Sequence, residues 1–283
     1  ILPSCNHYSE YAGLRNEMLI KYGTPISLKP YYELYKTKPR TAQREVNTLV
    51  REQINSLMLN IQDTENYDAI DAIRQGEYGI IYAKNQNMDP TQLPQKLVAD
   101  KKLVAALDAA KESNPSMVQS VYESARAVYG ELKKKGIDES ALTQTPGVGN
   151  LLVQIAVVAF LFPLAVFSLW PALPAWFIPK YFSDKAEDKM FHGTFLIALN
   201  ALLIFPVCGL LTFFVTWVKT SLLAGLIYVA LFPALCLFEW AYVGWIKDII
   251  HGFNAIRAEK SGVLGRLRDS RKQLFRDIDN IVK

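Results

Sequence analysis

The chain is poor in cysteine and histidine. It has three of each among 283 residues, and none stands at the spacing of zinc ligands or of a disulfide framework. Two of the cysteines, Cys208 and Cys236, fall inside apolar segments. We therefore expect no metal site and no disulfides, and a reducing compartment around the polar part of the chain.

A concentrated basic patch is also missing from the first half of the sequence. The net charge is only +4, and the Lys and Arg residues before position 149 are interspersed with Asp and Glu. Nucleic-acid-binding domains usually gather basic side chains on one face, so we expect no nucleic-acid partner. The basic excess of the last 30 residues follows an apolar run, which makes the lipid bilayer the expected partner.

Charge is scarce between residues 149 and 246, where three apolar runs stand at 151–170, 193–218 and 222–246. Each run has the roughly 20 residues that a transmembrane helix requires. Prolines at positions 163, 171, 206 and 233 interrupt the apolar sequence and free backbone carbonyls, which neighbouring helices must cover. The sequence thus predicts a multi-pass integral membrane protein with two to three spans in residues 149–246.

Two topologies remain open for this region. Three full spans would place residues 1–148 and 247–283 on opposite sides, yet both flanks are basic and the positive-inside rule favours the cytoplasm for both. A re-entrant hairpin over 151–178 followed by a two-span hairpin over 193–246 satisfies the rule. In that arrangement the soluble part is cytoplasmic, and a bacterial inner membrane is the expected location.

Two polar residues stand out within the apolar runs, Asn200 and Glu239. An intramembrane acid is a functional candidate by default. Glu239 lies within a turn or two of the expected boundary at Lys247, so both an interfacial position and a role inside the helix bundle are open. No series of such acids exists, which disfavours a proton-driven transporter.

The polar segments read mostly as helices. Apolar residues recur every three or four positions from Val46 to Ile61, which predicts an amphipathic helix, and further helices are expected in an extension over residues 63–148. Short strands are expected at 1–5 and 17–22. The tail, residues 247–283, is an amphipathic basic helix that either lies on the anionic leaflet or packs on the soluble domain.

The opening residues carry a family resemblance. Ile1-Leu2-Pro3, then a strand, a Gly23-Thr24-Pro25-Ile26 turn and a long amphipathic helix, resemble the closing part of the PlsC-like glycerolipid acyltransferases. The resemblance implies that residues 1–62 are the C-terminal end of the α/β acyltransferase domain. The expected fold class is therefore an α/β remnant followed by a helical extension and a helical membrane region. Pro3 corresponds to a position near the acyl-acceptor site.

The strongest motifs of that family, His-x-x-x-x-Asp and Glu-Gly-[Thr/Ser], do not occur. The fifth residue after His7 is Ala12, and His192 and His251 are followed at that distance by isoleucine. Acyl transfer needs a base oriented by a carboxylate. We accordingly assign no catalytic residue, and expect the chain to be inactive alone and to be the C-terminal part of a longer enzyme.

The expected function is that of the parent protein, a membrane-bound acyltransferase of phospholipid biosynthesis. It would need no cofactor, and would transfer a fatty acyl group from acyl-CoA or acyl carrier protein to glycerol 3-phosphate or a lysophospholipid such as lysophosphatidate. The alternative is a non-enzymatic membrane scaffold or assembly subunit with a cytoplasmic helical domain.

Overall fold

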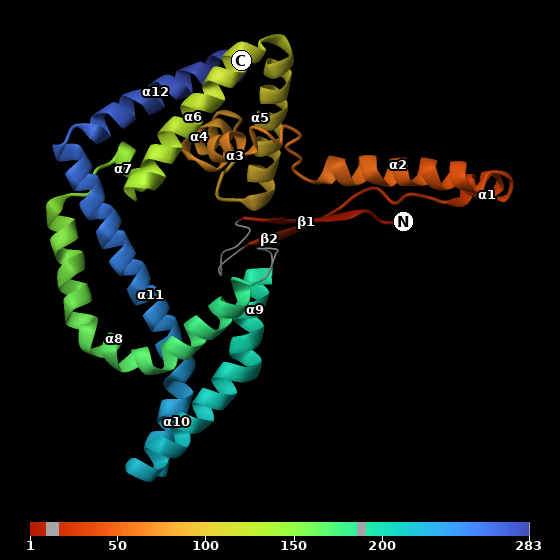
Figure 1. Ribbon diagram of the computed structural model, residues 1–283. Coiled ribbons are helices and arrows are strands. Elements are labelled where there is room, and N and C mark those ends of the chain that lie inside the picture. The colour runs from red at the N-terminus through yellow and green to blue at the C-terminus, as the bar shows by residue number, and fades with distance from the viewer. Residues whose placement is uncertain (10–16, 186–190, 283) are drawn as a thin grey trace. The chain divides into compact units, whose positions relative to one another are not determined.

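The chain is helical almost throughout in the computed structural model, which describes residues 1–9, 17–185 and 191–282 (Figure 1). About 80% of the chain is helical. It divides into two compact units. Unit 1 holds the described residues up to Lys134 together with residues 265–282, and unit 2 extends from Lys135 to Leu264. Each unit is described by itself.

The expectation of an α/β remnant is wrong. The described residues form one sheet of two antiparallel strands, β1 (Ser4–Tyr8) and β2 (Met18–Tyr22), with Ser4 opposite Tyr22 and Tyr8 opposite Met18. Both strands alternate between exposed and half-exposed residues. An α/β layer requires a wider sheet with a buried face, and this hairpin has none. The second strand was predicted in nearly the right place, whereas the first was expected at residues 1–5 and begins three residues later, at Ser4. The fold class is mainly α-helical.

A short helical reversal follows the hairpin. It consists of η1 (Lys29–Tyr31), α1 (Tyr32–Thr37) and α2 (Pro39–Leu57). Prolines stand in the first turns of η1 and α2, where a missing N–H costs nothing. The predicted amphipathic helix is therefore present, but only its Ala42 is buried, and the remaining apolar side chains of α2 are at most half-buried. Its apolar face is incompletely covered within unit 1.

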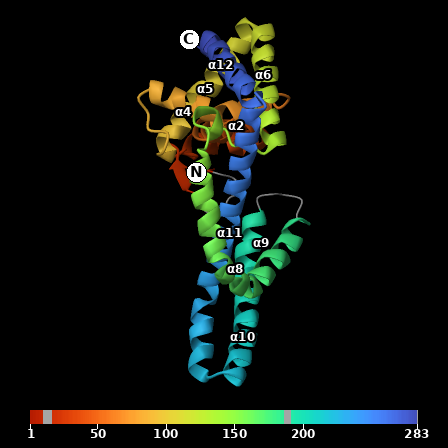
Figure 2. The same cartoon turned by 90° about the vertical axis from the view of Figure 1, so that its left-hand side faces the viewer.

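A bundle forms the core of unit 1. Its helices are α3 (Tyr67–Gln75), α4 (Glu77–Asn85), α5 (Leu93–Ser113), α6 (Pro115–Lys135) and α12 (Val263–Val282). Leu274 and Ile278 of α12 are buried in one cluster with Tyr122 of α6 and Ile70 of α3. Figures 1 and 2 show α12 beside α6. Of the two alternatives for the tail, packing on the helical domain is the one that the structure shows.

Unit 2 is built from long apolar helices. They are α7 (Ser140–Thr143), α8 (Val148–Ser183), α9 (Phe191–Leu199), the π-helical turn η2 (Asn200–Ile204), α10 (Phe205–Lys219) and α11 (Leu222–Lys260). Three stretches are long and apolar enough to cross a membrane, Val148–Trp170, Gly193–Lys219 and Leu222–Lys260. Their outward-facing side chains are large and apolar, as contact with lipid requires.

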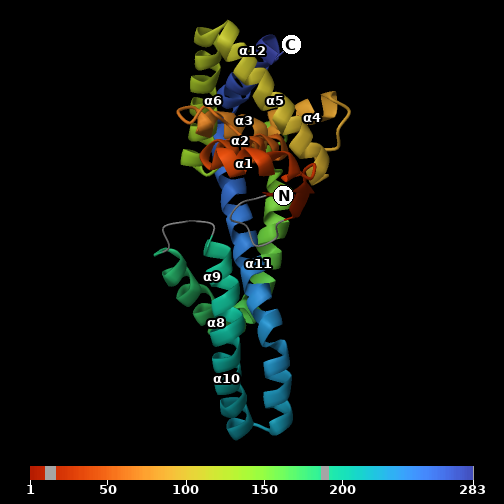
Figure 3. The same cartoon turned by 90° about the vertical axis from the view of Figure 1, so that its right-hand side faces the viewer.

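The helices of unit 2 pack as antiparallel pairs. The first part of α8 lies beside the second half of α11 (Figure 2), and α10 pairs with the first half of α11 (Figure 3). Figure 1 shows that α8 changes direction along its length. Pro163, Pro174 and Pro179 lie within this helix and remove backbone donors from it. A bent α8 is the geometry that a re-entrant segment needs, while the membrane face reached by each end stays a prediction.

Candidate functional site

Pro3, the residue assigned to an acceptor site by resemblance, is buried at the start of β1. Its carbonyl accepts a hydrogen bond from the Gly23 backbone at 2.8 Å, and the Ile1 carbonyl accepts one from Ile26 at 2.8 Å. These two bonds join residues 1–3 to the Gly-Thr-Pro-Ile segment just beyond the ends of the paired strands. A proline fits the position before a strand because it has no N–H to donate. The structure brings together the two segments on which the resemblance rests.

Gly23 also meets the end of α2. A Cβ atom placed on Gly23 would lie 3.2 Å from Leu57 Cδ1, 3.5 Å from Gln53 Oε1 and 3.5 Å from Pro3 Cβ. The absence of a side chain thus lets α2 close over the strand pair. These contacts hold Pro3 in its position. None of them comes from a basic side chain.

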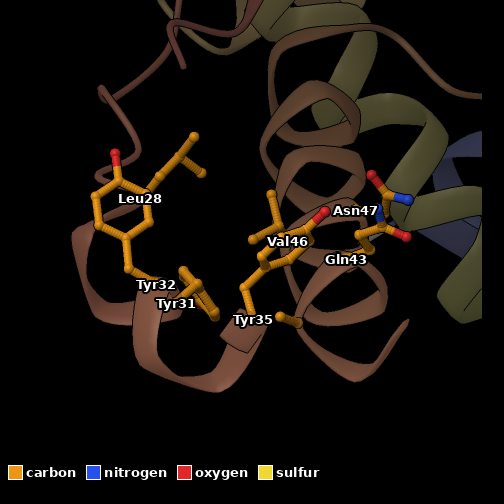
Figure 4. Close-up of a pocket in the computed structure, with 8 residues that line it drawn as sticks. Leu28, Tyr31, Tyr32, Tyr35, Gln43, Val46 and Asn47 are labelled. Atoms are coloured by element: carbon orange, nitrogen blue, oxygen red, sulfur yellow. The ribbon is translucent and has the colours of Figure 1, made fainter. Parts of the chain in front are cut away.

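An apolar groove lies between α1 and α2 (Figure 4). It has a volume of about 310 Å³ and is lined by side chains of η1, α1 and α2 and the residue before them: Leu28, Tyr31, Tyr32, Tyr35, Ala42, Gln43, Val46 and Asn47. Figure 4 shows Tyr35 directed from α1 toward Val46 of α2. No carboxylate, imidazole or thiol lines the groove. It can bind an apolar group, but it holds no acid or base for catalysis.

Sequence reasoning missed this groove. The signal for it was present in the Tyr31-Tyr32-Glu33-Leu34-Tyr35 run that precedes Pro39. Pro39 ends α1 and starts α2, so the chain reverses and the tyrosines of α1 face the first turns of α2. The run alone does not tell which tyrosines share a surface with α2.

His7 on β1 is half-buried in unit 1. Burial lowers the pKa of its imidazole, and the nearby Arg74 guanidinium lowers it further, while Asp100 opposes both. The neutral imidazole is therefore the form present at pH 7. Its neighbouring carboxylate is already engaged by two cations, so the His–Asp pair that acyl transfer requires is not assembled here.

Those two cations make Asp100 the centre of a buried ionic cluster. Asp100 is 1% exposed, and its carboxylate accepts a hydrogen bond from Arg74 at 3.1 Å and another from Lys96. Lys96 also donates to the Arg74 carbonyl at 2.7 Å. Buried charges need such partners. The cluster joins α3 to α5, and its charges are satisfied within the protein, so its role is structural.

The intramembrane acid Glu239 is buried between α8 and α11, with 7% of its surface exposed. The Ser168 hydroxyl donates to its carboxylate at 2.7 Å, and Ser168 is itself fully buried. Glu239 therefore contacts a neighbouring helix inside unit 2, while its depth in the bilayer stays a prediction. A hydrogen bond between helices in an apolar region fixes their relative rotation.

Asn200 makes a second polar contact between helical segments of unit 2. Its side-chain amide donates to the Ala175 carbonyl of α8 at 3.1 Å. That carbonyl would normally accept from residue 179, which is a proline without an N–H. Asn200 thus replaces a helical hydrogen bond, as predicted for carbonyls freed by prolines in a membrane. This ties η2 to the second part of α8.

Metal-ligating side chains are scattered in the described part of the chain. Within it, no three His, Cys, Asp or Glu side chains gather as metal ligands, and Cys5, Cys208 and Cys236 are free thiols. No family model, no curated protein and no solved structure matches this chain. The function must therefore be argued from the chain's own residues.

Proposed function

We propose that this chain is the C-terminal portion of a membrane-bound acyltransferase of phospholipid biosynthesis. The parent enzyme transfers a fatty acyl group from an acyl thioester to glycerol 3-phosphate or lysophosphatidate. The observation that carries the proposal is the backbone hydrogen bond from Gly23 to Pro3, because the two segments that it joins bear the family resemblance. The soluble unit then faces the cytoplasm of a bacterial cell.

The membrane unit has a physical purpose in such an enzyme. The acyl donor is water-soluble, whereas the product carries an acyl chain and partitions into the bilayer. Three apolar stretches that can span the membrane keep the enzyme at the place where its product enters.

The catalytic base has to come from outside these 283 residues. His7 is neutral, but its neighbour Asp100 is held by Arg74 and Lys96, so it cannot orient the imidazole. We therefore expect the purified chain to give no turnover above background with an acyl thioester and lysophosphatidate. Turnover by the chain alone would contradict this account of the missing dyad.

The decisive test is the coding DNA directly upstream of Ile1, translated in frame. The proposal requires a His-x-x-x-x-Asp and a Glu-Gly-[Thr/Ser] motif there. The complete gene product should then transfer a radiolabelled acyl group to lysophosphatidate, and replacing the motif histidine by alanine should abolish transfer. A start codon at or just before Ile1, or a complete product without transfer, would refute the proposal.

A non-enzymatic membrane scaffold is the second candidate. The observation in its favour is that Asp100, the buried carboxylate that acts on His7, is bound by internal partners, as in a structural domain. A scaffold predicts partner proteins that co-purify with the chain from membranes and a gene that begins near Ile1. The upstream sequence therefore separates the two candidates before any assay.

A further inference from the structure

The reversal formed by residues 28–46 exposes aromatic side chains. Tyr32 is 58% exposed and Tyr35 is 51% exposed, and the groove beside them is apolar. Tyrosine combines an apolar ring with a polar tip, and it is enriched where proteins meet the boundary between water and lipid. We name residues 28–46 the tyrosine hairpin. An apolar surface of this kind on a polar unit requires an explanation.

The tyrosine hairpin also has an excess of positive charge. It carries five basic and two acidic residues, and all seven are exposed: Lys29, Lys36, Lys38, Arg40, Arg44, Glu33 and Glu45. Lys36 binds Glu33 at 2.8 Å. Within the described residues the other four cations have no ion-pair partner. Each basic residue near an anionic surface strengthens binding about fivefold.

We propose that the tyrosine hairpin docks on the surface of an anionic bilayer, with its tyrosines at the level of the lipid headgroups. The cations meet the anionic headgroups, and the apolar groove faces the boundary of the acyl chains. The amides of Gln43 and Asn47 line the groove beside Val46, so polar groups stay within reach of headgroups or water (Figure 4). This docking does not depend on the proposed enzymatic function.

The bilayer is favoured over other occupants because the same chain carries membrane-spanning stretches. Because these stretches anchor the chain, the hairpin meets the bilayer at a high effective concentration. A weak contact with the headgroups is then sufficient to keep the hairpin bound. Single-stranded nucleic acid also uses cations and aromatic rings, but the membrane stretches of the same chain hold a bilayer close and not a nucleic acid. Tyrosine with lysine and arginine is the composition of interfacial anchors.

The test is hydrogen–deuterium exchange of the full chain in lipid nanodiscs. One set contains only phosphatidylcholine, and the other contains phosphatidylglycerol in addition. Backbone amides of residues 28–38 should exchange at least about tenfold more slowly in the anionic discs, because four unpaired cations act together. High salt should remove most of this protection. Peptides from α5 serve as an internal reference, because their exchange should be equal in both discs.

Two double variants separate the contribution of the tyrosine rings to docking from that of the cations. Tyr32→Ser with Tyr35→Ser should lower the protection by removing the interfacial rings, and Lys29→Gln with Arg40→Gln should weaken docking about thirtyfold. Tyr67→Ser, at an equally exposed tyrosine of α3, is the matched control and should change nothing. Unchanged exchange of the α5 peptides shows that each variant is folded.

Three outcomes would overturn the proposal. Equal exchange in both lipids would exclude docking on anionic headgroups. Equal protection in detergent without lipid would mean that the protein itself covers the hairpin. Protection by a single-stranded oligonucleotide, but not by anionic discs, would assign the surface to nucleic acid.

Discussion

The junction between α3 and α4 offers the sharpest test of the fold. Only Gly76 separates the two helices, and α4 turns back against the end of α3. A Cβ atom on the buried Gly79 would lie 1.9 Å from the Arg74 carbonyl oxygen and 2.6 Å from its carbon. Both are backbone atoms and cannot rotate away. Gly79→Ala must therefore displace α4 by about 1 Å, since the closest approach that real Cβ atoms show is 3.0 Å.

The displacement disturbs a packed core. Tyr78, next to Gly79, is 3% exposed and packs edge-on against Phe275 of α12 with ring centroids 5.3 Å apart. Forced backbone shifts in a core cost about 1–3 kcal/mol or more, whereas alanine is about 1 kcal/mol better than glycine in a helix. We expect Gly79→Ala to lower the free energy of unfolding by about 2 kcal/mol, because the overlap exceeds the propensity gain.

The same substitution at Gly130 is the matched control. Gly130 lies in α6, and a Cβ atom there would meet nothing within 4 Å. Gly130→Ala should raise the free energy of unfolding by about 0.5–1 kcal/mol, since only the backbone entropy of the unfolded chain changes. The opposite signs of the two effects come from tertiary contacts alone.

Pulse proteolysis in urea of the full chain in detergent measures both changes. With an m value of about 2 kcal/mol/M, the urea midpoint should fall by about 1 M for Gly79→Ala and rise by about 0.3–0.5 M for Gly130→Ala. A midpoint for Gly79→Ala at or above that of the parent chain would refute the described approach of α4 to α3.

The other predictions concern polar contacts. Asp100→Asn should destabilise unit 1 by about 3 kcal/mol in the same proteolysis assay, because Lys96 and Arg74 lose the charge of the buried carboxylate that both bind, and Arg74 keeps only its ion pair with Asp71. Glu33→Gln, at an exposed pair, should change stability by less than about 0.5 kcal/mol. Burial and a hydrogen bond raise the pKa of the Tyr78 hydroxyl, so the unfolded chain alone ionises near pH 10. The contribution of Tyr78 to the free energy of unfolding is complete below pH 10 and is lost as the pH rises above 10. The urea midpoint of the parent chain should therefore fall above pH 10, and Tyr78→Phe should make this fall less steep. Asn200→Ala should lower the free energy of unfolding of unit 2 by about 0.6–2 kcal/mol, measured by thermal unfolding. The loss should be much smaller in a Pro179→Ala background, where the backbone N–H that Pro179 lacks is restored. An equal loss in both backgrounds would contradict the assigned role of Asn200.

The helices were predictable because their signals are local. The apolar runs gave the three membrane-spanning stretches, since length and hydropathy alone decide whether a helix can cross a bilayer. The period of apolar residues from Val46 gave α2, and Pro39 stands where that helix begins. The position of β2 was also close, because it is a short apolar run beside turn residues, whereas the polar β1 begins three residues after the predicted start.

The fold class was not predictable in the same way. A strand pattern tells that a segment is extended, but not how many partners it finds, and here β1 and β2 find only each other among the described residues. The tail was equally undecided, because an amphipathic basic helix suits both a leaflet and a protein core. Leu274 and Ile278 enter the bundle only because α3 and α6 present a complementary apolar surface.

The sequence by itself determined which segments are helical, which can enter a membrane and which motifs of acyl transfer are missing, since these depend on neighbours along the chain. Only the tertiary structure decided that Glu239 meets Ser168, that Asn200 serves the carbonyl freed by Pro179, and that the tyrosines form a groove with α2. Such contacts join residues that are far apart in sequence. They follow from how helices bend and pack, and that packing is a property of the whole chain.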